Sequence, residues 1–228
     1  CGQNTLMRVA QSDYLVLLNA DIQIRDSAFI QKLIKPLIEK GIDLTSSKHT
    51  PLPPRSFYES ILVTSVELKE ILFETFNYGN NVYTCHGSAR AFSRALYKEM
   101  TFKKSVGEDA YAFLYCAFNS YKYSYVRDTE TLYRLPDNFA DHKSQSTRFF
   151  KGKNNFGDIF GEEFVRKNMC IPPFFYIKAL FKAIPTILQK PVKTVLYLFI
   201  VSFLRIQTLF VGTISETWEI SVSSKKLQ

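Results

Sequence analysis

The sequence has little cysteine and a single tryptophan. Its four cysteines, at positions 1, 85, 116 and 170, are too far apart for a zinc knuckle or a CxxC redox pair. They are also too few for a disulfide scaffold in a chain of 228 residues. We therefore expect reduced thiols in a cytosolic protein. The N-terminal residues show no secretory signal, and the chain has no internal repeat, low-complexity tract or long Gly/Ser linker.

The charged residues are also unevenly distributed along the chain. Residues 1–140 hold 16 basic and 15 acidic residues, whereas residues 141–228 hold 13 basic and 6 acidic residues, so almost the whole net charge of +8 belongs to the C-terminal part. That part is rich in Phe, Leu and Ile, and a basic segment mixed with large apolar residues favours a membrane surface over a nucleic-acid groove. The chain contains no RNA-binding aromatic motif, so we expect no nucleic-acid partner.

Hydrophobic periodicity predicts alternating strands and helices. Tyr14–Leu18 is a continuous apolar run, typical of a strand buried on both faces of a sheet. Apolar residues between Phe29 and Ile38 keep helical spacing, and Gly41 ends that helix. The further expected elements are a strand from Ile42, a helix over 57–75, a short strand over 82–85, a turn at 86–88 opening a helix over 90–100, a helix over 108–118, one or two strands over 123–133, and basic helices after Pro136. This order predicts an α/β fold.

Two C-terminal stretches differ from the rest. Residues 174–190 form an amphipathic helix that Pro185 must kink, with Lys178, Lys182 and Lys190 available for anionic headgroups. Residues 194–214 are long enough to span a bilayer but are interrupted by Arg205 and Gln207. A charge at the centre of a spanning helix costs about 2.5–3.5 kcal/mol. Membrane contact and a helix packed on other protein both remain open for this region.

Three short constellations carry residues suited to catalysis. Asn19-Ala20-Asp21 follows the apolar strand, at the position where open α/β sheets bind ligands. Glu108-Asp109 opens a helix, and Gln145 precedes Arg148 in the basic region. Each also has an ordinary reading, respectively a turn or N-cap, a complement to the helix dipole, and a solvated helix face.

Their order in the chain makes a more specific pattern. The motifs Tyr14-Leu-Val-Leu-Leu-Asn-Ala-Asp21, Gly87-Ser88 followed by Phe92, Gly107-Glu-Asp-Ala-Tyr111 and Gln145-x-x-Arg148-Phe149 occur in this order. In this respect the chain resembles family 2 glycosyltransferases over about residues 1–155. The resemblance implies a GT-A (Rossmann-like) mixed sheet flanked by helices. The first βα units of that fold are missing here, so we expect a chain truncated at its N-terminus. Residues 156–228 would then be a basic, apolar, membrane-associated helical region.

The resemblance implies a metal-assisted, inverting transfer. Asp21 would bind Mg²⁺ or Mn²⁺, which neutralises the diphosphate leaving group as a Lewis acid. Asn19 stands where the family's Asp-x-Asp motif usually has its first Asp; its amide can bind the donor but brings no charge. Asp109 would be the general base for the acceptor hydroxyl, and Glu108 would orient it or bind acceptor.

The remaining expected roles concern both substrates. Gln145 and Arg148 match a Gln-x-x-Arg-Trp motif whose Arg meets the donor pyrophosphate, which suits a planar guanidinium. Phe149 replaces the Trp and keeps an aromatic platform on the acceptor side. Gly87 and Ser88 would border the acceptor pocket. His142 is a candidate metal ligand by resemblance, although a lone His is more often structural.

Together these features predict an enzyme. We expect transfer of a sugar from a nucleotide sugar, a UDP-sugar in the first instance, to a glycan or lipid-linked acceptor in polysaccharide or cell-envelope biosynthesis. Lysines before the 194–214 run would keep that side of the membrane cytoplasmic. The alternative is a non-catalytic, membrane-associated scaffold or a degenerate transferase remnant, which Asn19 and the missing N-terminal units favour.

Overall fold

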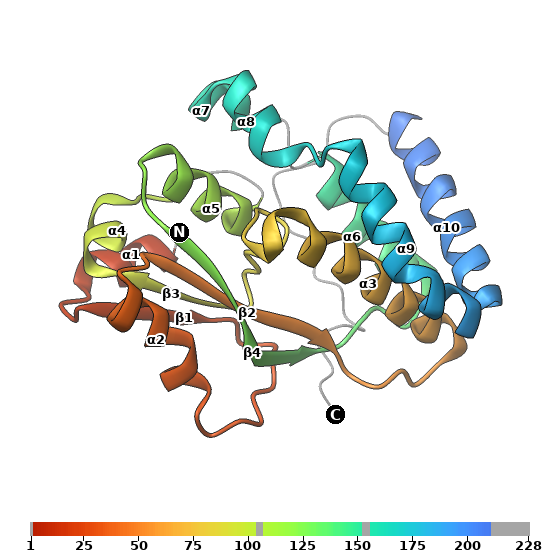
Figure 1. The fold of residues 1–228 in the computed structure, drawn as a ribbon, viewed down its shortest axis with the longest axis horizontal. Coiled ribbons are helices and arrows are strands. Elements are labelled where there is room, and N and C mark those ends of the chain that lie inside the picture. The colour runs from red at the N-terminus through yellow and green to blue at the C-terminus, as the bar shows by residue number, and fades with distance from the viewer. Residues whose placement is uncertain (1, 104–106, 152–155, 211–228) are drawn as a thin grey trace.

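A four-stranded mixed sheet forms the centre of the structure (Figure 1). The computed structural model describes residues 2–103, 107–151 and 156–210, without the side chains of residues 148–151 and 208–210. The strands are β1 (Tyr14–Leu18), β2 (Leu44–Pro51), β3 (Ala89–Ser93) and β4 (Tyr123–Tyr133), in the spatial order β1-β3-β2-β4. The predicted α/β architecture, a mixed sheet flanked by helices, is confirmed.

Strand β3 reverses the direction of the sheet. It pairs antiparallel with both β1 and β2, whereas β2 pairs parallel with β4. The prediction of a helix over residues 90–100 was therefore wrong for its first half, since the helix α4 begins only at Arg94. The short strand expected over 82–85 was also wrong, because residues 82–84 form a turn and residue 85 has no regular structure. Ala and Arg rank among the strongest helix formers, and pairing on both sides of β3 overrides this propensity.

Strand β1 lies at an edge of the sheet among the described residues. Only Leu17 is buried, and Leu18 is 47% exposed, so the expectation of a strand buried on both faces was wrong. The apolar run fixed the strand but not its place in the sheet, because a buried and an edge strand can share the same composition.

Both faces of the sheet carry an apolar core. On one face, α2 (Phe29–Lys40) packs Phe29, Leu33 and Leu37 against Ala89 and Ala91 of β3. Gly41 ends this helix in the left-handed conformation, with φ of 58°, as expected. On the other face, Phe92 of β3 joins a larger core that includes residues of α4 (Arg94–Glu99) and α5 (Glu108–Phe118). Side chains alternate along β3, so Ala89 and Ala91 face one core and Phe92 faces the other.

The remaining helices complete the structure. They are α1 (Gly2–Val9), α3 (Phe57–Thr75) with the short 3₁₀ helix η1 (Phe76–Gly79), α6 (Phe139–Lys151), α7 (Phe156–Phe160), α8 (Glu162–Met169), α9 (Pro173–Gln189) and α10 (Pro191–Phe210). Helix α7 contributes Phe156 and Phe160 to the core that contains α5. Helices α9 and α10 pack on α3, beside the sheet (Figure 1).

One stretch of the described residues is long and apolar enough to cross a membrane. It is Glu162–Gln189, which comprises α8 and α9 and is largely unburied. Membrane association of the C-terminal region, in this coarse sense, agrees with the sequence prediction. The run expected over 194–214 lies in α10 up to residue 210, and residues 211–214 lie outside the described part of the chain.

Candidate functional site

The candidate site lies at the carboxyl ends of the parallel strands. Since β1, β2 and β4 run in the same direction, their carboxyl ends lie along one edge of the sheet, together with the start of the antiparallel β3. This edge crosses the strand ends and is distinct from the outer strand β1. Asn19 follows β1, His49 lies near the end of β2, Ser88 precedes β3, and Tyr133 ends β4. This is the edge at which open α/β sheets bind their ligands.

Five predicted site residues come together here from three parts of the chain. The Asn19 backbone N–H donates to the Ser88 carbonyl at 2.9 Å. A Cβ atom on Gly87 would lie 3.6 Å from Glu108 Oε1 and 3.7 Å from Asp109 Cβ. The 87–88 turn therefore contacts both the end of β1 and the start of α5. We call Asn19, Gly87, Ser88, Glu108 and Asp109 the edge cluster.

The start of α5 places two carboxylates beside the turn. Gly107 has φ of 112°, a left-handed conformation that favours glycine, and the helix begins at the next residue. Asp109 Oδ1 accepts from the Ala110 backbone N–H at 2.8 Å. Negative charge in the first turn is stabilised by the helix dipole. Both acidic side chains are half-buried, so they stay accessible to a polar ligand.

Arg90 of β3 anchors the first turn of α5. Its side chain is fully buried, and its Nη1 donates to the Glu108 carbonyl at 2.9 Å while Nη2 lies 3.5 Å from Gln3 Oε1. The guanidinium carbon lies 5.7 Å from the ring centres of Phe92 and Phe102. No carboxylate pairs with Arg90 among the described residues, and its buried Nε has no partner there. Sequence reasoning missed this residue, because its burial follows from the pairing of β3 on both sides.

Asp21 lies in the segment that joins β1 to α2. Gln23, two residues further on, exchanges two backbone hydrogen bonds with Leu132 of β4, at 2.8 and 2.9 Å. This bridge holds the half-buried Asp21 at the same edge of the sheet as Asn19. Within the described ranges, no group of three or more His, Cys, Asp or Glu residues could hold a metal ion. A cation bound by Asp21 and the Asn19 amide would depend on ligand oxygens from the substrate.

A histidine pair at this edge was not predicted. The His49 ring stacks on Tyr133 with centroids 3.6 Å apart and lies 5.3 Å from the His86 ring. Burial, with His86 nearby, holds the pKa of His49 well below its usual value. Burial lowers the pKa of His86 to about 4. Both imidazoles are therefore neutral at pH 7. His86 stands directly before the Gly87-Ser88 turn, which was the only sequence signal available.

Hydroxyl groups connect the histidine pair to Ser88. His49 Nδ1 lies 3.3 Å from Thr131 Oγ1, and the Thr131 hydroxyl lies 3.0 Å from Ser88 Oγ. Thr131 and Ser88 are both buried. The Ser88 hydroxyl thus contacts Thr131 of β4, and the Ser88 carbonyl accepts a hydrogen bond from the Asn19 backbone. This arrangement fixes the turn on which the edge cluster depends.

Helix α6 carries the other predicted site residues. The Tyr58 hydroxyl lies 2.7 Å from His142 Nδ1. Burial, followed by the Lys69 charge, lowers the pKa of His142 to about 4. This ring is therefore neutral and joined to α3, as a structural histidine would be. Gln145 is half-buried one turn further along α6. Arg148 and Phe149 follow on the same helix, but their side chains lie outside the described part of the structure.

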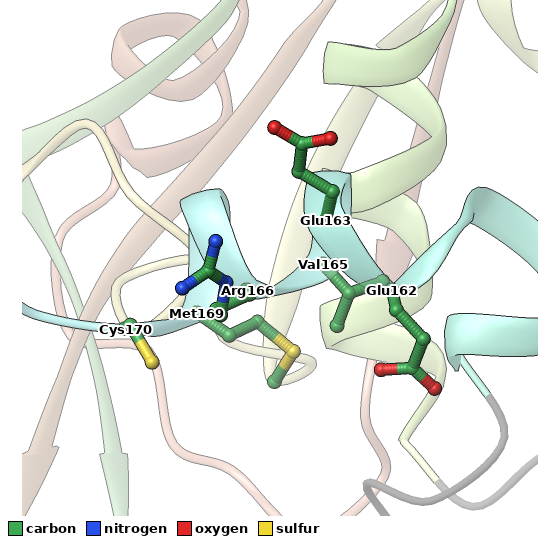
Figure 2. A pocket seen from close by; sticks show the side chains of 6 residues that line it. All are labelled: Glu162, Glu163, Val165, Arg166, Met169 and Cys170. Atoms are coloured by element: carbon green, nitrogen blue, oxygen red, sulfur yellow. The ribbon is translucent and has the colours of Figure 1, made fainter.

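A surface hollow of about 640 Å³ lies elsewhere, along α8 (Figure 2). Its lining consists of Glu162, Glu163, Val165, Arg166, Met169 and Cys170. Figure 2 shows that the two glutamate side chains point apart, so they do not converge on one ligand position. No residue of the edge cluster lines this hollow, and we place the candidate site at the sheet edge instead.

Comparisons with known proteins add no identification. No protein-family model matches the chain, and no curated protein is significantly similar to it.

Proposed function

We propose that the chain is an inverting glycosyltransferase that uses a nucleotide-sugar donor, with UDP-sugars as the first candidates. The single observation that supports this most is the edge cluster. Motifs separated by about 90 residues in the sequence meet there with an amide, two carboxylates and a glycine-containing turn at the ligand-binding edge of an α/β sheet. The proposed acceptor is a glycan or a lipid-linked sugar at the cytoplasmic face of a membrane.

The proposed reaction is a single in-line displacement. The acceptor hydroxyl oxygen forms a bond to the anomeric carbon of the donor while the bond from that carbon to the diphosphate oxygen breaks. The bonding pair leaves with the nucleoside diphosphate, and Asp109 takes the hydroxyl proton. Such a displacement inverts the anomeric configuration. Glu108 lies beside Asp109 and the Gly87 turn, where it would orient the acceptor.

The donor side is assigned to Asn19, Asp21, Gln145 and Arg148. A Mg²⁺ or Mn²⁺ ion, when bound, supplies charge neutralisation to the diphosphate. Asp21 and the Asn19 amide would hold it, and His142 is a weaker candidate since its Nδ1 already faces Tyr58. One carboxylate and one amide fit a magnesium site that the substrate phosphates complete. Arg148 would meet the pyrophosphate and Phe149 the acceptor.

Asp109→Asn tests the proposal. The amide keeps the shape of the side chain but cannot accept the proton, so we expect turnover to fall by about 10²–10⁴-fold while donor affinity is unchanged. Release of the nucleoside diphosphate from a panel of UDP-sugars measures turnover, and calorimetric titration measures donor binding. Glu163→Gln on α8, an exposed acidic residue, is the matched control. Undiminished turnover of the Asp109 variant would remove it from the role of base.

The second candidate is a membrane-associated scaffold without catalysis. Asn19 in place of a carboxylate and the exposed apolar residues of α9 and α10 favour it. A scaffold would bind lipid vesicles but give no heat of binding with any nucleoside diphosphate in the presence of Mg²⁺. A transferase would give saturable binding in the same titration.

A further inference from the structure

Three sides of α9 differ in chemistry. Phe175, Ala179 and Ala183, spaced four residues apart, lie on the side that is covered by the rest of the protein. The opposite side carries exposed apolar residues at helical spacing, namely Ile177, Leu180, Phe181, Ile184 and Leu188. Lys178 and Lys182 are exposed between these two sides. The small alanines permit close packing of α9 on α3, and the large apolar side chains on the opposite side of α9 are exposed.

Helix α9 lies along α3 in the antiparallel direction. Near the start of α9, the Phe175 ring lies 5.2 Å from that of Phe76, directly after the end of α3. Beyond its other end, Lys190 Nζ lies 2.6 and 2.7 Å from the carboxylate oxygens of Glu67, within α3. Contacts at both ends fix the orientation of α9 relative to α3.

This packing disfavours a spanning orientation of α9. The same part of α3 carries Glu70, whose carboxylate lies 2.8 Å from Lys48 Nζ, and Glu74, whose carboxylate lies 3.6 Å from Arg127. If α9 crossed the bilayer, these partly exposed ion pairs would enter the hydrocarbon with it. Ionised side chains are unfavourable at that depth. The break between α8 and α9 at residues 170–172 further shortens any continuous span.

Helix α10 also carries exposed apolar residues. Its exposed apolar residues are Val192, Val195, Leu198, Phe199, Phe203 and Ile206. Lys69 of α3 lies over the Tyr197 ring at 5.5 Å, and Phe139 of α6 lies 6.0 Å from Phe203. Both helices thus contact α3 and leave other sides uncovered among the described residues (Figure 1). We call the exposed apolar residues of α9 and α10 together the α9–α10 surface.

The charge of this region indicates the partner. Residues 173–210 contain four lysines and one arginine but no acidic residue. A large apolar surface bordered by cations fits the boundary between anionic headgroups and acyl chains. A second copy of the chain would bring the same positive charge to the contact and would repel it.

We propose that the α9–α10 surface is an interfacial membrane anchor. Both helices lie parallel to an anionic bilayer, with their apolar side chains in the outer acyl region and Lys178 and Lys182 at the headgroups, and α9 does not span the bilayer. This proposal deepens the membrane association put forward with the proposed function. It does not depend on sugar transfer, so vesicle binding and turnover can fail separately.

Vesicle flotation of the full chain tests the partner. Ile177→Asp places a charge on the α9–α10 surface, and Ile38→Asp on α2 is its matched control, since both isoleucines are 57% exposed. We expect the α9 variant to lower the partition coefficient by at least about tenfold and the control to leave it unchanged. Lys178→Ala with Lys182→Ala should lower binding to phosphatidylserine-containing vesicles by about 30-fold, and much less with pure phosphatidylcholine.

Tryptophan reporters distinguish an interfacial from a spanning orientation of α9. With the single tryptophan, Trp218, replaced by Phe, Phe181→Trp and Leu188→Trp each give one fluorophore on α9. These positions are about 10 Å apart along the helix axis. Quenching by lipids brominated at different depths should place both reporters at the same shallow depth. Reporters that differ in depth by about 10 Å would overturn the interfacial orientation.

Two other outcomes would also overturn the proposal. Absence of vesicle binding by the native sequence would exclude the membrane as the partner. A lipid-free dimer that Ile177→Asp dissociates, in a chain that does not float with vesicles, would assign the surface to a second copy. Sedimentation velocity in the absence of lipid gives the oligomeric state.

Discussion

Glu59→Gln should destabilise the protein strongly, because Glu59 belongs to a buried ion pair at the start of α3. Glu59 is fully buried and Arg134 is 7% exposed, and Arg134 Nη1 lies 2.9 Å from Glu59 Oε1. Glu59 Oε2 accepts from the Arg55 backbone N–H at 2.6 Å, and Arg134 Nη1 also donates to the Pro53 carbonyl at 2.6 Å. The pair therefore joins the end of β4 to the loop before α3.

The expected magnitude follows from burial. Removing one partner leaves a buried charge without compensation, which costs about 3–5 kcal/mol. The buried Nε of Arg134 has no hydrogen-bond partner among the described residues even with Glu59 in place. For a chain of this size the loss corresponds to a fall in Tm of about 6–20 °C. Replacing both residues with apolar ones, Glu59→Leu with Arg134→Met, should recover most of the loss.

Urea unfolding of the full chain, followed by circular dichroism, measures the free energy of unfolding. The matched control is Glu39→Gln in α2, because Glu39 and Lys35 form an exposed pair 4.0 Å apart. Removal of that pair should change the free energy by less than about 0.5 kcal/mol. A Glu59→Gln variant within about 1 kcal/mol of the native sequence would refute the argument from burial.

Two further predictions concern Arg90 and the neutral histidines. Arg90→Met should stay folded, since an apolar side chain of similar length replaces a buried charge. The variant loses the hydrogen bond to the Glu108 carbonyl, so we expect kcat to fall by up to about 100-fold with donor affinity unchanged. Arg90→Lys should restore part of the lost kcat. Parallel losses of Tm and kcat would indicate a purely structural role. Folding lowers the pKa of His86 and of His142 to about 4. As the pH falls, the histidines of the unfolded chain therefore take up protons before those of the folded chain do. The free energy of unfolding should decline from about pH 6.5 towards pH 4. Urea midpoints against pH measure this decline; His142→Gln should flatten it, and an unchanged slope would contradict the pKa assignment.

Local sequence patterns were sufficient for most elements. The run Tyr14–Leu18 gave its strand, the helix over 57–75 begins and ends where its pattern predicts, and Gly41 ends α2 because glycine adopts the left-handed conformation readily. Glu108 opens α5, as acidic residues do at helix starts. These features depend on neighbours within a few residues, so periodicity and capping predict them.

The tertiary structure decided the features that depend on distant partners. Strand β3 exists because β1 and β2 pair with it, and the same pairing buries Arg90 under α5. The Gly87 turn meets Glu108 through the fold alone, and His49 joins His86 in the same way. The sequence by itself determined the apolar and basic character of the C-terminal helices. Only packing on α3 decided which side of α9 is covered, because periodicity defines the sides of a helix but not the partner that covers one of them.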